Sequence, residues 1–253
     1  MRKNILLVLL GMLIMAVISV GVYAINANEI IYKNTTVDAA IDDLYSKISS
    51  LNAAPCLLSV GTSETIGSMY VCNLGDNIVR KLYVLKVNEN TVDLILDRNI
   101  NSDKLTYSSA LTYFSTGAGK NIISNWDNVE SVSIPKAQDI ANAANIAYWD
   151  VTTVTNDPGY IYFGGSTYSD ASNRSNYKWL YNYTKDCSSY GCDANTSLTG
   201  SEAAGYWTAD TVSDNSSRVW RAGYKGYLAT VSVNNTETAI RPVVTILKSN
   251  LQG

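Results

Sequence analysis

Two strand-forming runs decide the fold: KLYVLKV at residues 81–87 and TVDLILD at residues 91–97, joined by NEN at residues 88–90. Both runs are rich in aliphatic and β-branched side chains, which favour extended backbone. The polar tripeptide between them is typical of a turn. We therefore predict a β-hairpin over residues 81–97, and with it an antiparallel sheet.

The carboxy-terminal part of the chain is predicted to be β-rich as well. Strands are expected at 205–208, 218–222, 227–233 and 240–247, with Lys225-Gly226 as the turn between the second and the third. Pro242 lies within the fourth run and has no backbone N–H, so it indicates an edge strand or a bulge. Together with the hairpin, these strands favour an α+β domain with an antiparallel sheet.

The middle of the chain has weaker patterns. In SIPKAQDIA at residues 133–141, Pro135 suits a first helical turn, and a short alanine-rich helix should follow. Residues 150–202 are rich in Gly, Ser, Asn and Tyr. So long a stretch is either a surface loop with a role or partly extended structure.

The amino-terminal residues 1–25 resemble an export signal. Arg2 and Lys3 precede Ile5 to Ile25, a run without charge that would span about 31 Å as a helix, close to the ~30 Å core of a bilayer. Basic residues remain cytoplasmic, so we expect everything after Ile25 outside the cell. The segment is either an uncleaved single-pass anchor in the cell membrane or a signal peptide cleaved after Ala24, which would release a secreted protein.

Residues 26–55 are predicted to connect this segment to the main domain at 56–250. Apolar residues recur at heptad spacing within 37–51, namely Val37, Ile41, Leu44, Ile48 and Leu51. This pattern predicts either a short coiled-coil stalk with weak self-association or an amphipathic helix lying on its own domain. Residues 52–55, NAAP, are typical of a linker.

The four cysteines form two pairs that are close in sequence. In an oxidising compartment, Cys56 with Cys72 and Cys187 with Cys192 are expected to form local disulfides, although three pairings are possible. The spacings do not match a zinc site, and the chain has no histidine to complete one.

The composition excludes several kinds of function. The absence of histidine excludes a Ser-His-Asp triad, a Cys-His pair and a His-ligated metal. Neither a phosphate-binding loop nor a calcium loop is found, and a formal net charge of −3 gives nucleic acid no electrostatic footprint. We expect no catalytic residues, no metal and no cofactor.

Aromatic residues within 150–202 are the candidate ligand-binding residues. Rings on a loop pinned by Cys187–Cys192 would lose little entropy on contact, although several of them could instead fold into the core. The set is Tyr160, Tyr162, Tyr168, Tyr177, Trp179, Tyr181 and Tyr183.

The order of several short motifs resembles a known group of proteins. GYWT at 205–208, Val219-Trp220, Gly226 and IRPVVTI at 240–246 are similar to a Gly-Tyr-Trp … Ala-Trp … Gly … Val-Arg-Pro-Val-Ile-Thr-Leu signature. That signature belongs to uncharacterised surface proteins of Gram-positive bacteria. Their carboxy-terminal domain is similar to the C-type-lectin-like fold shared with formylglycine-generating enzymes.

The resemblance implies a fold more than an activity. No cysteine follows Cys192, so the copper-holding cysteines of formylglycine-generating enzymes have no counterpart. The calcium motifs of C-type lectins, Glu-Pro-Asn or Gln-Pro-Asp followed by Trp-Asn-Asp, are also missing. Asn125-Trp126-Asp127 has the residues of the last motif in a different order, and it lies too early in the chain. The matched Trp207, Trp220 and Arg241 are expected to be structural.

These observations together predict a membrane-anchored or secreted bacterial surface protein that binds an extracellular glycan or protein without catalysis. A pilin-like structural subunit is the second hypothesis, and an extracellular enzyme the third.

Overall fold

The structure is a computed structural model that divides into two compact units, Met1–Ser49 and Ser50–Gly253. In the first unit, β1 (Ile31–Tyr32) pairs with β2 (Thr35–Thr36) in antiparallel fashion. The residues that the structure describes are 31–32, 35–36, 55–76, 78–100, 105–153, 159–167, 170–182 and 203–252.

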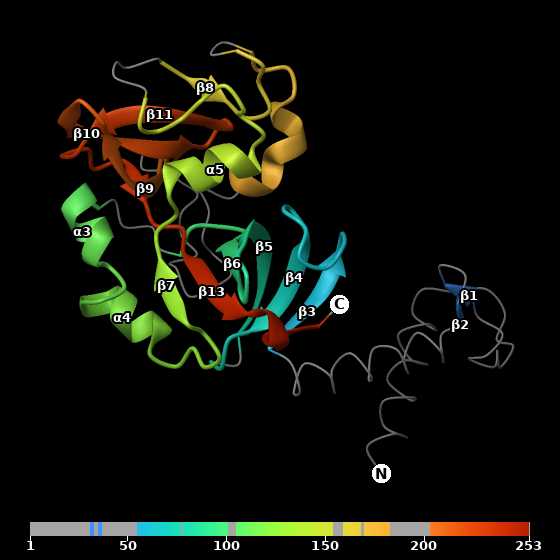
Figure 1. The fold of residues 1–253 in the computed structure, drawn as a ribbon. Coiled ribbons are helices and arrows are strands. Elements are labelled where there is room, and N and C mark those ends of the chain that lie inside the picture. Colours follow the sequence, from blue (N-terminus) through green and yellow to red (C-terminus); the bar gives the residue numbers. More distant parts are fainter. Residues whose placement is uncertain are drawn as a thin grey trace, which may run out of the picture. The chain divides into compact units, whose positions relative to one another are not determined.

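The second unit is a mixed α+β domain with two sheets in its described part (Figure 1). One sheet has seven strands in the order β14-β3-β4-β5-β6-β13-β7 and the other has five in the order β12-β9-β10-β11-β8. Neighbouring strands are antiparallel except for the pairs β14–β3 and β12–β9. The predicted α+β class with antiparallel sheet is therefore confirmed.

The predicted hairpin forms the centre of the seven-stranded sheet. β5 (Val79–Val87) pairs with β6 (Thr91–Leu96), and the register runs from Leu82 opposite Leu96 to Val87 opposite Val92. The remaining strands of this sheet are β3 (Cys56–Val60), β4 (Met69–Asn73), β7 (Ser131–Ser133), β13 (Val243–Leu247) and β14 (Leu251–Gln252).

The five-stranded sheet contains three of the four predicted carboxy-terminal strands. These are β9 (Gly205–Val212), β10 (Asn215–Gly223) and β11 (Tyr227–Ser232), and they are flanked by β8 (Ile161–Tyr162) and β12 (Thr238–Ala239). β8 shows that residues 150–202 are partly extended, one of the two alternatives that the sequence left open.

The fourth predicted strand, 240–247, is corrected by the structure. β12 ends at Ala239 in the five-stranded sheet, and β13 begins at Val243 in the other sheet, so residues 240–242 cross from one sheet to the other. Pro242 lies in this crossing, where its missing N–H costs no ladder bond. Its carbonyl accepts a hydrogen bond from the Leu96 N–H at 3.1 Å. Pro242 therefore marks a change of sheet, not an edge or a bulge.

Short helices pack on both sheets. The predicted helix after Pro135 is α5 (Ala137–Ala143); it contacts β5, β9 and β10 and lies between the sheets (Figure 1). The others are α3 (Tyr107–Thr112), α4 (Gly117–Ile123), and the 3-10 helices η2 (Arg174–Leu180) and η3 (Lys248–Asn250).

Two apolar clusters form the core. One contains Leu82, Val92 and Trp207, and the other contains Ile140, Trp149 and Trp220. Each predicted structural tryptophan therefore lies in a different cluster, and both are fully buried. Burial on this scale supplies the main driving force for folding.

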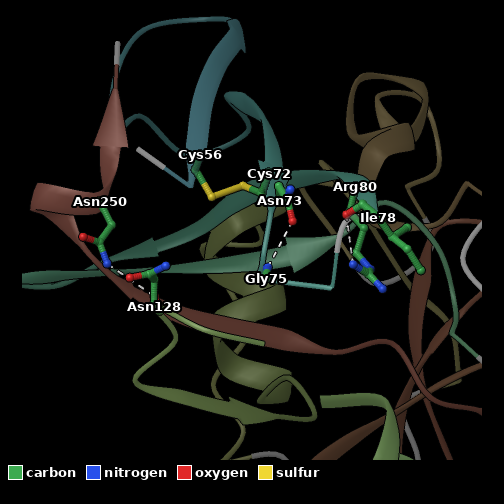
Figure 2. The surroundings of a disulfide bond; sticks show 8 residues. All are labelled: Cys56, Cys72, Asn73, Gly75, Ile78, Arg80, Asn128 and Asn250. Carbon is green, nitrogen blue, oxygen red and sulfur yellow. Dashed lines mark hydrogen bonds between the residues drawn. A yellow bond between two sulfur atoms is a disulfide. The ribbon is translucent and has the colours of Figure 1, made fainter. Parts of the chain in front are cut away.

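The disulfide Cys56–Cys72 is confirmed. These residues are directly opposite each other in β3 and β4, and their sulfur atoms are bonded at 2.05 Å (Figure 2). Beside the bond, the side chain of Asn73 accepts a hydrogen bond from the Gly75 N–H at 3.1 Å (Figure 2).

Several predictions fall on residues outside those described: the segments 1–25 and 37–51, Tyr168, Tyr183, and the pair Cys187–Cys192. Within the described ranges, no helix has the length and apolar character needed to cross a membrane.

Candidate binding face

The structure separates the predicted aromatic residues into an inward and an outward group. Tyr177, Trp179 and Tyr181 belong to η2 or follow it, and they pack against the second core cluster. Tyr160 and Tyr162 lie at the edge strand β8, and 53% of the Tyr160 surface is exposed. Burial thus distinguishes residues that the sequence grouped together.

The inward group is held by aromatic and backbone contacts. Trp179 stacks on Tyr83 of β5 with ring centroids 5.5 Å apart and ring planes 27° apart. The ring centroids of Phe163 and Tyr181 lie 6.1 Å apart. Contacts of this kind exclude these rings from a freely accessible surface and join η2 to the core.

Arg241 anchors the carboxy-terminal end of η2. Its side chain is fully buried, and it donates hydrogen bonds to the carbonyls of Trp179 at 3.3 Å, Leu180 at 3.0 Å and Asn182. Burial lowers the pKa of Arg241, but a guanidinium remains charged in proteins. The carbonyls therefore satisfy a buried cation inside the fold.

The outward group, Tyr160 and Tyr162, packs against the buried Tyr227 of β11, and we call these three residues the tyrosine face. The ring centroid of Tyr160 lies 4.3 Å from that of Tyr227 and 6.2 Å from that of Tyr162. Tyr162 meets Tyr227 edge-on at 6.0 Å. Spacings in this range are favourable between aromatic rings, so the three rings support one another.

Local sequence explains how the tyrosine face is built. Tyr162 and Tyr227 are directly opposite each other in the antiparallel pair β8–β11, so their side chains lie on one face of the sheet. Gly223 faces Tyr227 across the β10–β11 pair, and a Cβ there would lie 2.1 Å from the Tyr227 ring. Glycine at this position leaves room for the ring. Gly226, with φ of +77°, supplies the left-handed turn that begins β11.

Three cations lie at the tyrosine face. The Arg174 guanidinium lies over the Tyr162 ring at 5.7 Å, and the Lys225 ammonium lies 5.4 Å from the Tyr224 ring centroid, beside β11. Arg221 of β10 is opposite Ala229, two residues beyond Tyr227 on the same face of β11. Its guanidinium donates to the hydroxyl of Thr238 at 3.5 Å, a long hydrogen bond.

Charge at the tyrosine face is not compensated by carboxylates in the described part of the chain. The ion pairs there join Arg80 to Asp76, Lys86 to Asp139, Arg98 to Asp97 and Lys248 to Glu64. None of them includes Arg174, Arg221 or Lys225. Arg174, Arg221 and Lys225 therefore bring positive charge to this aromatic surface without a direct ion pair among the described residues, on a chain whose formal net charge is −3.

The Tyr227 hydroxyl stays protonated at neutral pH. Burial raises the pKa of Tyr227, the neighbouring tyrosines add to this, and Arg221 opposes it. Tyr227 is therefore a neutral phenol whose ring is buried behind Tyr160 and Tyr162.

A carboxylate-centred loop connects β8 to η2. Asp170 accepts hydrogen bonds from the N–H and hydroxyl groups of Ser166 at 3.0 and 2.9 Å, and from those of Ser172 at 3.0 and 2.6 Å. These four donors hold the pKa of Asp170 well below its usual range. The ionised Asp170 carboxylate therefore holds Ser166 and Ser172 together, and Arg174 follows near Tyr162.

Sequence reasoning missed four residues at this surface: Arg174, Arg221, Tyr224 and Tyr227. The YKGY stretch at 224–227 was interpreted only as a turn and the start of a strand. Tyr227 is brought to Tyr160 by the β8–β11 pairing, a non-local contact that no local pattern predicts. In the described part of the chain, no group of His, Cys, Asp or Glu is arranged to hold a metal ion.

Comparisons with protein-family models, with curated proteins and with solved structures found no match to this chain.

Proposed function

We propose that this chain is a bacterial surface protein, anchored in the membrane or secreted, whose domain at 56–250 binds an extracellular glycan or protein without catalysis. The tyrosine face is the proposed contact surface. The export-like segment at residues 1–25 and the disulfide Cys56–Cys72 support a location outside the cytoplasm, because such bonds persist in oxidising compartments.

One observation carries the proposal: the Tyr160 ring packs at a tilt against Tyr227, with ring centroids 4.3 Å apart, yet 53% of Tyr160 is exposed. An apolar ring held in place by a neighbour and left open to solvent loses little conformational entropy when a ligand covers it. Tyrosine also offers a wide amphipathic contact area, and for that reason it is enriched in binding sites. The proposal moves the contact surface from the full set of loop aromatics to Tyr160 and Tyr162, which the buried Tyr227 supports from within.

The finer fold is proposed on the resemblance in the sequence. The C-type-lectin-like assignment is supported by the motif order that includes Trp207, Trp220 and Arg241, and all three residues are fully buried. Buried residues of this kind preserve a fold and do not bind ligands. We therefore assign to them a role in the fold and none in recognition.

Glycan and protein arrays probed with the full-length chain in detergent test the proposed function. Tyr160→Ser should weaken binding roughly tenfold, which corresponds to about 1.4 kcal/mol. Leu111→Ser is the matched control, since Leu111 on α3 is 51% exposed and lies away from the tyrosine face. If the parent and the Tyr160→Ser variant bind the same ligand equally well, the ligand contacts another surface of the chain and the assignment to the tyrosine face is overturned.

A further inference from the structure

We infer that the ligand of the tyrosine face is an anionic glycan, meaning a sugar polymer that carries carboxylate, sulfate or phosphate groups. This inference rests on the proposed function and adds the chemical class of the ligand. It follows from the combination of an exposed tyrosine ring beside β8, an edge strand of the five-stranded sheet, with cations that lie near it.

The aromatic part of the surface suits a sugar ring. Tyr160 uses one side of its ring against Tyr227, at 4.3 Å and with 38° between the planes, and the side chain remains 53% exposed. A pyranose has an apolar C–H face and a polar hydroxyl rim, so it matches a ring with polar groups beside it. The hydroxyl of the half-buried Tyr162 is such a polar group.

The cationic part adds selectivity for negative charge. Arg174 and Lys225 lie against tyrosine rings and have no carboxylate partner among the described residues. A guanidinium binds carboxylate, sulfate or phosphate through paired N–H donors, so an anionic group on the ligand would pair with the Arg174 guanidinium, which no ion pair in the described part of the chain includes.

The local charge contrasts with the charge of the whole chain. With a formal net charge of −3 and a pI near 5.0, the protein as a whole repels polyanions. Attraction of a polyanion therefore requires a local group of cations, and Arg174 and Lys225 are such cations near the tyrosine face. Single-stranded nucleic acid also combines stacking with charge, but it requires a basic groove that follows several phosphates. Separate cations on η2 and in the β10–β11 turn favour short anionic units over a continuous phosphate backbone.

The test measures binding of the full-length chain to four immobilised probes: polygalacturonate for carboxylate, heparin for sulfate, a phosphomannan for phosphate, and neutral dextran. A single-stranded oligonucleotide is the fifth probe. We expect at least one anionic glycan to bind more tightly than dextran and the oligonucleotide. Raising ionic strength from about 0.01 M to about 0.1 M shortens the Debye length from ~30 Å to ~10 Å and should weaken that binding several-fold.

Charge variants identify the residues responsible. Arg174→Gln and Lys225→Gln should each weaken binding of the anionic glycan roughly tenfold, and Arg174→Lys should weaken it less than Arg174→Gln. Lys120→Gln on α4 is the matched control, because Lys120 is exposed and lies on a different element. Thermal melting of each variant shows whether the fold is unchanged.

The outcomes separate the two proposals. If dextran binds as tightly as the anionic glycans and Tyr160→Ser abolishes binding while the charge variants do not, the anionic assignment is overturned and the tyrosine face stands. If the oligonucleotide binds most tightly, a nucleic-acid ligand replaces the glycan. If no probe binds, the anionic-glycan assignment fails, and the arrays with Tyr160→Ser then decide the proposed function separately.

Discussion

The guanidinium of Arg241 lies 4.7 Å from the ring centroid of Tyr206, and both side chains donate a hydrogen bond to the carbonyl of Leu180. Both residues are fully buried, and burial raises the pKa of Tyr206. The end of η2 is therefore fastened to the five-stranded sheet by one cation and one phenol. Because η2 begins at Arg174, this contact at its far end also positions the cation beside Tyr162.

Arg241→Met should lower the free energy of unfolding by about 3–5 kcal/mol, because it leaves buried carbonyls without donors. Urea denaturation of the variant and the parent measures the difference. Lys178→Met is the control, since Lys178 is an exposed cation of the same helix. A variant that unfolds at the parent's urea concentration but has lost ligand binding would reassign Arg241 to recognition.

Trp179→Ser should lower the melting temperature by roughly 5 °C, whereas Tyr160→Ser should leave it close to that of the parent. Trp179 packs between Tyr83 and the backbone of Gly67, and a half-buried ring contributes about 2 kcal/mol. Differential scanning calorimetry measures both variants. The sequence alone placed Trp179 and Tyr160 in one binding loop, and identical melting of the two variants would favour that interpretation.

Replacing Cys56 and Cys72 by serine should destabilise the domain by roughly 3 kcal/mol, the value for a loop of this size in the chain-entropy model. Both cysteines are fully buried, so a mild reductant should open the bond only under denaturing conditions. Thiol titration with and without denaturant measures this protection. The double variant of Cys187 and Cys192 is the comparison, and its shorter loop predicts a smaller loss.

Asp76→Asn should reduce the loss of stability at acidic pH. Burial raises the pKa of Asp76, but hydrogen bonds from Arg80, the Ile78 N–H and Trp126 outweigh it and lower the pKa below 3.8. Because the pKa of Asp76 is lowered in the folded state, its ionised carboxylate stabilises the fold above pH 3.8. This stabilisation is lost as pH falls through the folded-state pKa. Urea midpoints of the parent and the Asp76→Asn variant, measured from pH 5 downward, test the direction of this effect on stability. A steeper acid decline in the variant would contradict it.

Local sequence predicted the parts of the fold that depend on neighbouring residues. The hairpin 81–97, the helix after Pro135 and three carboxy-terminal strands follow from periodicity and turn residues. The close spacing of Cys56 and Cys72 predicted their bond, because a short loop closes at low entropic cost. The strand 240–247 was wrong in part, since its residues are β-prone throughout but belong to two sheets.

The sequence by itself determined an α+β domain with antiparallel sheet, its central hairpin and the disulfide Cys56–Cys72, because these depend on contacts between residues near each other in the chain. Only the tertiary structure decided that Trp179 faces Tyr83 and that Tyr160 faces Tyr227. Each of the two aromatic residues is followed in sequence by an aliphatic residue and a tyrosine. They differ in the distant strand that packs against each, and burial is set by that packing and not by local pattern.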